Sequence, residues 1–212
     1  MIIETLVVGP LAVNCYIVAD EQTRAGIIID PGDEPERIAK RVAELRLHVD
    51  RLVATHGHVD HVGAVEPLKK LLGAKFCLNR KDERYVVHTA ESGAQFGMAG
   101  LENPTVDIYL QEGDAVVFGR QTLRVIETPG HTPGGIILVG DGNAFVGDLV
   151  FAGSIGRTDL PGGDYATMIA SLEEKLLLLP DEVKLHPGHG ESTTVAIERR
   201  YNPFLRGLGA RR

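Results

Sequence analysis

The segment THGHVDH, residues 55–61, constrains this chain more than any other stretch of its sequence. Three of the eight histidines (His56, His58 and His61) lie within these seven residues, together with Asp60. Imidazole nitrogen and carboxylate oxygen are the ligands that zinc, iron and manganese sites use in proteins. The crowding of such side chains into one segment therefore predicts a metal site.

The segment lies where a strand is expected to lead into a helix. VDRLVAT (49–55) is β-branched and apolar, which predicts a strand, and AVEPLKKLL (64–72) has the pattern of a helix. Residues two apart in extended backbone point to the same side, so His56 and His58 would face the same way. Strand ends that lead into helices are common ligand sites in layered α/β proteins.

Three later segments each place a candidate ligand next to glycines at the end of an expected strand. These are His131 in TPGHTPGG, Asp148 in VGDLVF, and His186 with His189 in HPGHG. Glycine allows a sharp turn and a close approach of a cofactor. Together with the histidine segment, these loops predict one metal site with two ions.

Strands and helices are expected throughout the chain. Short β-branched or apolar runs predict strands at 2–8, 14–19, 26–30, 49–55, 114–119, 122–128, 135–140, 143–148 and 183–188. Apolar spacing predicts helices at 33–47, 64–72, 164–179 and 191–200. Asp33 and Glu36 would cap the first helix. Residues 81–110 are rich in small and turn residues, which predicts a short helix and then a long surface connection. We expect this segment to form one wall of the cleft and to influence specificity.

This order of elements predicts an α/β fold in which sheets are sandwiched between helices, as one domain over residues 1–212. A net charge of −7 and a pI near 5.6 argue against nucleic-acid binding, which needs a basic surface. No apolar run reaches the roughly 20 residues that span a bilayer. The first residues do not have the pattern of a signal peptide, and two cysteines give no disulfide framework. We therefore expect a cytoplasmic protein without a membrane partner.

The motifs together resemble a known family. THGHVDH, a Gly-flanked His, a Gly-Asp pair and a late Gly-His, in this order over residues 55–190, resemble the metallo-β-lactamase fold superfamily. Within it, TPGHTPGG, GDLVFAGSIGRTDLPGGD, HPGHGEST and a late NPFL are similar to short bacterial hydrolases related to glyoxalase II. The resemblance implies a four-layer αββα sandwich. Only 22 residues follow HPGHG, so we expect this chain to act without the helical C-terminal domain of full glyoxalase II.

The resemblance also implies a role for each candidate residue. One metal would be bound by His56, His58 and His131, and a second by Asp60, His61 and His189. Asp148 would bridge the two ions, and Asp60 and Asp148 are the candidate catalytic residues. Asp30 matches an aspartate that supports the histidine loop through hydrogen bonds, whereas His186 falls outside the pattern and would be structural. Zinc is the first expectation for both ions, with iron or manganese as alternatives.

The implied activity is that of a thioesterase on S-lactoylglutathione or a related small thioester. Two divalent ions roughly 3.5–4 Å apart can hold a shared water and lower its pKa, and a thiolate leaves without much help from an acid. Arg157 stands where glyoxalase II has a basic residue for glutathione, but Asp159 replaces the expected tyrosine. Arg157 would either bind an anionic group of the substrate or pair with Asp159 to hold its loop.

Three alternatives remain open from the sequence. A persulfide dioxygenase of the same fold would hold one iron with two histidines and an aspartate, and would not need Asp60, His61 and His189 as ligands. A nuclease of the superfamily would need an inserted domain and a basic surface that this chain lacks. A non-catalytic metal-binding module is the third. The native metal, the physiological thioester, the oligomeric state and the role of residues 81–110 cannot be derived from the sequence.

Overall fold

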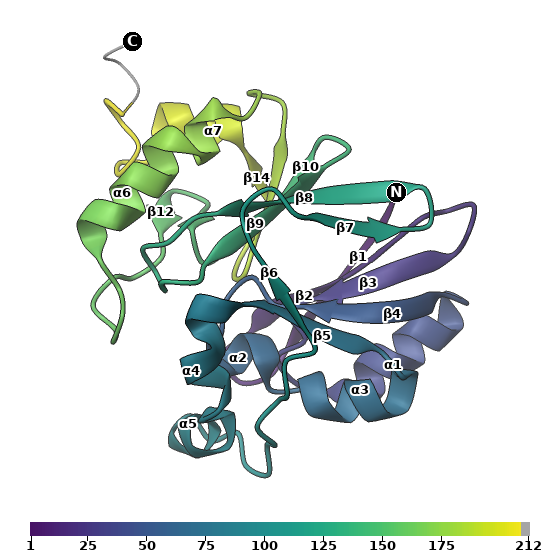
Figure 1. The fold of residues 1–212 in the computed structure, drawn as a ribbon. Helices are drawn as coiled ribbons and strands as arrows, with labels where there is room; N and C mark the ends of the chain where they lie inside the picture. Colours follow the sequence, from purple (N-terminus) through teal and green to yellow (C-terminus); the bar gives the residue numbers. More distant parts are fainter. Residues whose placement is uncertain (209–212) are drawn as a thin grey trace.

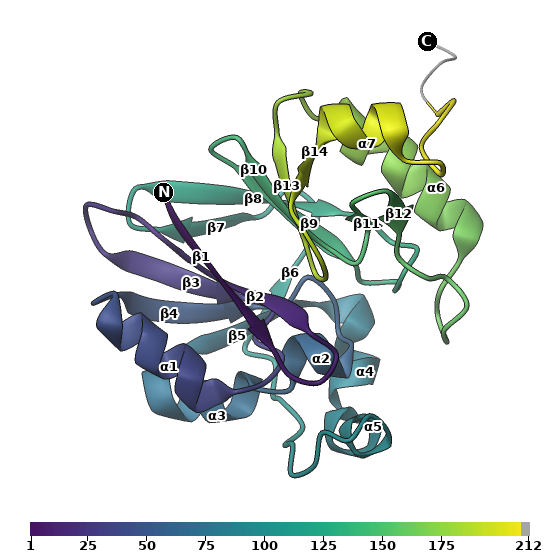
Figure 2. The same cartoon turned by 180° about the vertical axis from the view of Figure 1, so that it is seen from behind.

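Two six-stranded β-sheets pack face to face, and helices cover their outer faces (Figure 1; Figure 2 shows the same arrangement from behind). The structure is a computed structural model that describes residues 1–208, so residues 209–212 of the expected domain lie outside the described range. The four layers follow the order helix, sheet, sheet, helix. The expected αββα sandwich is thereby confirmed.

The first sheet has the strand order β1-β2-β3-β4-β5-β6. Its strands are β1 (Ile2–Val8), β2 (Val13–Ala19), β3 (Ala25–Ile29), β4 (His48–Val53), β5 (Lys75–Asn79) and β6 (Ile108–Leu110). β1, β2 and β3 pair antiparallel, and the pairs from β3 to β6 are parallel. Because β4 is parallel to its neighbours, its carboxyl end opens onto a sheet edge where the histidine segment follows.

The second sheet has the order β14-β13-β10-β9-β8-β7. Its strands are β7 (Ala115–Phe118), β8 (Gln121–Glu127), β9 (Ile136–Gly140), β10 (Asn143–Gly147), β13 (Lys184–Pro187) and β14 (Thr193–Thr194). β10 and β13 are parallel, and the other pairs are antiparallel. The short strands β11 (Val150–Phe151) and β12 (Ser154–Ile155) form a separate ribbon.

Helices of the two halves of the chain cover different sheets (Figure 1). On the first sheet they are α1 (Pro35–Glu44), α2 (Val59–Val62), α3 (Val65–Leu72) and α4 (Glu83–Val86), and α5 (Thr89–Gln95) packs against α2. On the second sheet they are α6 (Tyr165–Glu174) and α7 (Val195–Tyr201). Short 3₁₀ turns occur at η1 (Arg80–Asp82) and η2 (Leu176–Leu178).

Side-chain alternation along the strands explains the layering. In β3, Ile27 and Ile29 point into the core between the two sheets, whereas Ile28 packs under α1 with Ile38 and Val42. A third apolar cluster fills the space between the second sheet and α6 and α7. Both faces of each sheet are thus buried along much of their length, which is why the central strands read as continuous apolar runs.

Three local predictions were wrong in detail. Asp33 and Glu36 do not cap the first helix: α1 begins at Pro35, and Glu34 before it has a φ of 56° and no capping side chain. Proline is favoured in the first helical turn and starts the helix there. The expected helix 164–179 ends at Glu174 and continues as η2. Residues 81–110 hold two short helices before β6, where one was expected.

None of the helices in residues 1–208 is both long enough and apolar enough to cross a bilayer.

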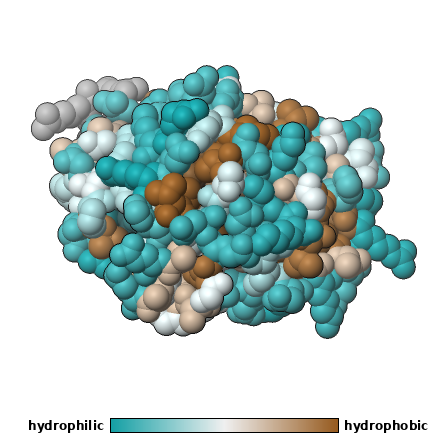
Figure 3. All heavy atoms as spheres, turned by 60° about the horizontal axis from the view of Figure 1, so that its bottom comes forward, coloured by the Kyte–Doolittle hydropathy of each residue, from teal (hydrophilic) through white to brown (hydrophobic). Residues whose placement is uncertain are grey.

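Polar side chains cover most of the face in Figure 3, and hydrophobic residues form short bands between them. Cys15 and Cys77 are both buried free thiols.

Candidate metal centre

The histidine segment leaves the first sheet at the carboxyl end of β4 and enters α2. His58 is the last residue before α2 and keeps an extended backbone, and Asp60 and His61 lie in the helix itself. His56 and His61 are buried, whereas His58 and Asp60 are partly exposed. The segment therefore presents candidate ligands from the end of a strand and the start of a helix. Two of these side chains are buried and two are accessible to solvent.

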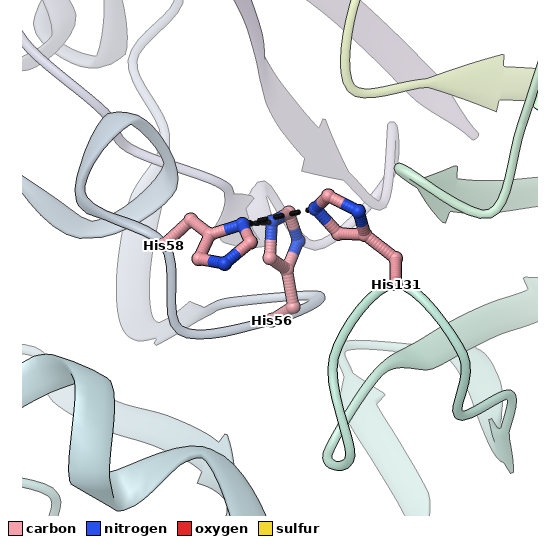
Figure 4. A group of neighbouring side chains, drawn as sticks. All are labelled: His56, His58 and His131. Atoms are coloured by element: carbon pink, nitrogen blue, oxygen red, sulfur yellow. Dashed lines mark hydrogen bonds between the residues drawn. The ribbon is translucent and has the colours of Figure 1, made fainter. Parts of the chain in front are cut away.

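The first group of donors consists of His56, His58 and His131 (Figure 4). His131 comes from the loop between β8 and β9 in the second sheet. Its Nε2 lies 2.9 Å from Nδ1 of His58, which in turn lies 3.1 Å from Nε2 of His56. Three ring nitrogens on two loops thus converge on one point, although 70 or more residues separate His131 from the others.

The second group consists of Asp60, His61 and His189. His189 follows β13 and brings its Nε2 to 3.2 Å from Oδ2 of Asp60. The same oxygen lies 3.7 Å from Nε2 of His61. One carboxylate and two imidazoles therefore form a second set of donors beside the first.

Asp148 lies between the two groups, just after β10. Its Oδ1 lies 3.4 Å from Nε2 of His61, and its Oδ2 lies 3.6 Å from Nε2 of His131 and 3.7 Å from Nε2 of His189. Its carboxylate also forms a donor set with His56 and His61. All seven residues that the sequence singled out as candidate ligands are thus brought together in one place.

Three buried polar atoms in residues 1–208 have no hydrogen-bond partner, and all belong to this cluster: both ring nitrogens of His61 and Oδ1 of Asp148. Burying a polar atom without a partner costs roughly 1–3 kcal/mol. His61 Nε2 and Asp148 Oδ1 face each other across a gap that a cation would satisfy from both sides. The donor set therefore fits a divalent metal.

The two groups differ in protonation. Burial lowers the pKa of His56, and burial together with His131 lowers the pKa of His58 to about 4. Burial also disfavours the charged forms of His61 and His189, but nearby carboxylates outweigh it and raise the pKa of both. His56 and His58 are therefore neutral and ready to bind metal, whereas His61 and His189 must lose protons when metal binds.

Glycine is required beside Asp148. A Cβ built on Gly188 would collide with Oδ1 of Asp148 and with Cε1 of His61. Asn14 in β2 holds the same loop, since its side-chain amide donates to the carbonyl oxygens of Pro187 and Gly190 at 3.0 and 2.9 Å. The loop that carries His189 is therefore bound to the first sheet, although it belongs to the second.

His186 points away from the donor groups. Its Nε2 is 2.9 Å from Oδ1 of Asn143, and its ring stacks on Phe145 with centroids 4.9 Å apart. Its contacts are those of the structural residue that was expected.

Asp30 supports the histidine segment, as expected. Its carboxylate accepts hydrogen bonds from the backbone N–H of Thr55 at 2.7 Å and from the Thr55 hydroxyl at 2.8 Å. Its Oδ2 lies 3.1 Å from Nδ1 of His61. Asp30 itself has a φ of 53°, a backbone conformation that aspartate tolerates better than most residues. The carboxylate thus holds Thr55 before the histidine segment and places a negative charge beside the outer nitrogen of His61, whose Nε2 faces the centre.

Asp82 joins the two loops that carry the first group, and sequence reasoning did not identify it. Its Oδ2 accepts from the backbone N–H of Gly57 at 2.9 Å and from the Thr132 hydroxyl at 2.7 Å, and its Oδ1 accepts from the N–H of Gly134 at 2.6 Å. The carboxylate is completely buried. One side chain in η1 therefore fixes the backbone next to His56, His58 and His131.

Arg157 lies beside the centre but is already paired. Its guanidinium binds the Asp159 carboxylate through two hydrogen bonds of 2.7 Å each. Its carbonyl oxygen lies 2.7 Å from Nδ1 of His131, which leaves Nε2 of that ring for the centre. The loop-holding pair that the sequence allowed is formed, and whether Arg157 also binds substrate stays a prediction.

A four-layer αββα sandwich with clustered histidines and aspartates at one edge of its sheets defines a class of metal-binding proteins. The family profile of the Metallo-beta-lactamase superfamily matches residues 8–189, and the chain belongs to this superfamily of metal-dependent hydrolases.

Relatives and solved structures agree with this assignment. The chain is 40% identical to "Hydroxyacylglutathione hydrolase GloC" of Haemophilus influenzae, over 97% of this chain and 98% of that protein. It is 32% identical to the mitochondrial persulfide dioxygenase ETHE1 of Mus musculus, over 90% and 70% of the two chains.

Among solved structures, the BLEG-1 B3 metallo-beta-lactamase is similar with a TM-score of 0.90 and 31% identity, covering 97% of this chain and 100% of that one. TTHA1623 in a di-iron-bound form has a TM-score of 0.87 and 38% identity, covering 95% and 100%.

Proposed function

We propose that this chain is a dinuclear metal-dependent thioesterase of glyoxalase II type. Its substrate would be an S-acylglutathione such as S-lactoylglutathione, or a related small thioester. The observation that carries the proposal is the position of Asp148 between two complete donor groups. The similarity to GloC over nearly the whole of both chains supports the choice of substrate.

The proposed ligands of the first ion are His56, His58 and His131. Those of the second are Asp60, His61 and His189, and Asp148 would bridge the two. Zinc is the proposed metal, and iron or manganese would suit the same nitrogen and oxygen donors. When bound, two such ions supply a water of lowered pKa and a Lewis acid for a carbonyl oxygen.

The chain's own residues would orient the reaction. Asp60 and Asp148 are the proposed catalytic residues, because their carboxylates lie among the histidines of the two donor groups. His189 and Asp60 are partly exposed there, at 28% and 14% of their side-chain surface. A thioester carbonyl can approach from this side. Its thiolate leaves readily because the parent thiol has a pKa of about 8.5, so no further acid is needed.

We also propose that residues 1–212 act as one domain in the cytoplasm. Arg157 remains a candidate for binding an anionic part of the substrate, which would have to displace Asp159 from the guanidinium.

A persulfide dioxygenase is the second candidate, and the similarity to ETHE1 is the observation that favours it. Such an enzyme needs one redox-active iron with open positions. The intact group of Asp60, His61 and His189 supports the hydrolase instead. A non-catalytic metal-binding module is the third candidate, and catalysis of any kind would exclude it.

Metal-dependent hydrolysis tests the proposal. Zinc-loaded protein should hydrolyse S-lactoylglutathione, lose this activity with a chelator and regain it when zinc is added back. Zinc cannot support oxygen chemistry by redox, so the same preparation should consume no oxygen with glutathione persulfide. If zinc-loaded protein hydrolyses no thioester while iron-loaded protein consumes oxygen with the persulfide, the dioxygenase is the correct function.

A further inference from the structure

Tyr85 on α4 forms a wall of the candidate metal centre. Its ring meets the ring of His58 edge-on, with centroids 5.3 Å apart. Its hydroxyl donates to the carbonyl oxygen of Pro161 at 2.7 Å. A Cβ built on Gly162 would collide with the same hydroxyl, so the 160–163 loop lies directly against it. α4 is therefore fixed between a proposed metal ligand and the loop beside the centre.

Arg84 brings a positive charge to the same wall. Its guanidinium lies over the Tyr85 ring, 4.9 Å from the centroid, and its Nη2 donates to the Tyr85 hydroxyl at 2.9 Å. The side chain is exposed to solvent. One aromatic ring thus separates an accessible guanidinium from His58. The contact with Tyr85 limits the rotamers of Arg84 and lowers the entropy that it would lose on binding a ligand.

Arg84 differs from its basic neighbours in the same segment. Arg80 lies 3.9 Å from Glu83 and stacks on an aromatic ring, and Lys81 lies 2.6 Å from Glu127. Across residues 1–208, no carboxylate oxygen lies within 4.0 Å of the Arg84 guanidinium. Its charge therefore remains available.

The other nearby charges cannot take its place. Arg157 is neutralised by Asp159. Burial raises the pKa of Asp82 and the charge of Arg84 opposes this rise, but the oxygens of Asp82 already accept three hydrogen bonds and form no ion pair with Arg84. The chain as a whole carries a net charge of −7, which repels anions at long range. An anionic substrate thus needs a cation near the centre. Among the described residues, Arg84 provides a guanidinium there that no carboxylate neutralises.

We propose that Arg84 binds a carboxylate of the substrate, with Tyr85 holding the guanidinium in place. A planar guanidinium matches a carboxylate through two parallel hydrogen bonds. A thioester whose reacting carbonyl lies at the metal centre and whose carboxylate lies several bonds away, as in an S-acylglutathione, can reach from one to the other. This inference rests on the proposed function, because it identifies the part of that substrate which the short chain recognises.

The test is a binding measurement that needs no turnover. Calorimetry on zinc-loaded protein would compare S-hexylglutathione, a thioether that cannot be hydrolysed, with its dimethyl ester, which lacks both carboxylates. Arg84→Ala should weaken binding of the diacid about tenfold, as expected for a partly exposed charge-assisted pair. It should leave binding of the diester within about twofold. Arg84→Lys should recover part of the loss. Arg80→Ala is the matched control and should bind both compounds as the wild type does.

Three results would overturn the proposal: unchanged binding of the diacid by Arg84→Ala, an equal loss for diacid and diester, or no binding of the diacid by the wild type. The proposed function fails separately. If diacid binding depends on Arg84 but no thioester is hydrolysed, the anion site stands and the thioesterase does not. If the wild type hydrolyses thioesters and Arg84→Ala binds the diacid normally, only the anion site is refuted.

Discussion

Asp82 offers a test of how the metal centre is held together. Asp82→Ala would leave the N–H groups of Gly57 and Gly134 and the Thr132 hydroxyl without their acceptor. Each unpaired buried donor costs about 1–3 kcal/mol. Because water can enter the space of the lost carboxylate, we expect a loss of about 3–5 kcal/mol in the free energy of unfolding. Asp82→Asn keeps an amide oxygen as acceptor, and we expect a loss of about 1–2 kcal/mol.

The assay combines urea unfolding of metal-free protein with zinc equivalents per folded chain. Asp20 provides the matched control, because this buried carboxylate accepts from the N–H groups of Gln22, Thr23 and Arg120 at 2.8, 3.4 and 2.6 Å. It lies after the end of β2 that is remote from the His189 loop. Asp20→Ala should lose similar stability and keep its zinc, whereas Asp82→Ala should also bind zinc more weakly. Wild-type zinc binding by folded Asp82→Ala would refute the positioning role.

Three further perturbations test other parts of the centre. Asp148→Asn keeps the size of the side chain but removes charge between the two donor groups, so metal analysis should show loss of the second ion first and turnover should fall strongly. Arg157→Ala should raise KM for charged and uncharged thioesters together and lower Tm, because Asp159 occupies the guanidinium; a rise confined to charged substrates would instead show that Arg157 binds them. Acidification from about pH 7 to about pH 5 should release metal first from the group that contains His61. The pKa of His61 is raised, so protons compete with the metal there at a higher pH than at His58, whose pKa is lowered. Equal release from both groups on dialysis would contradict this order.

The candidate ligands could be read from the sequence because their signals are local. His56, His58, Asp60 and His61 occupy one short segment, and His131 and Asp148 stand beside glycines at strand ends. The order of the expected strands and helices predicted sheets between helices, and the resemblance to the superfamily implied the four layers. The support given by Asp30 came only from the resemblance to the superfamily.

Asp82 could not be found in this way. Its hydrogen bonds join residues that are 25, 50 and 52 positions away in the sequence. The helices around it are short and show no regular apolar spacing. The sequence analysis placed residues 81–110 at one wall of the cleft, but it did not single out Arg84 and Tyr85, because the pattern of this segment is irregular. The start of α1 was misplaced because Asp33 and Glu36 fit a capping pattern locally, whereas the turn preceding Pro35 decides where the helix begins.

The most direct measurement of the two-metal centre is zinc content and thioesterase activity in His189→Ala beside the wild type. His189 belongs to the second donor group, and its nearest donor contact is Asp60 at 3.2 Å. We expect about two zinc ions per wild-type chain. The variant should lose one of them and most of its hydrolysis of S-lactoylglutathione, while the ion held by His56, His58 and His131 remains. Wild-type zinc content and wild-type turnover in folded His189→Ala would contradict a dinuclear hydrolase.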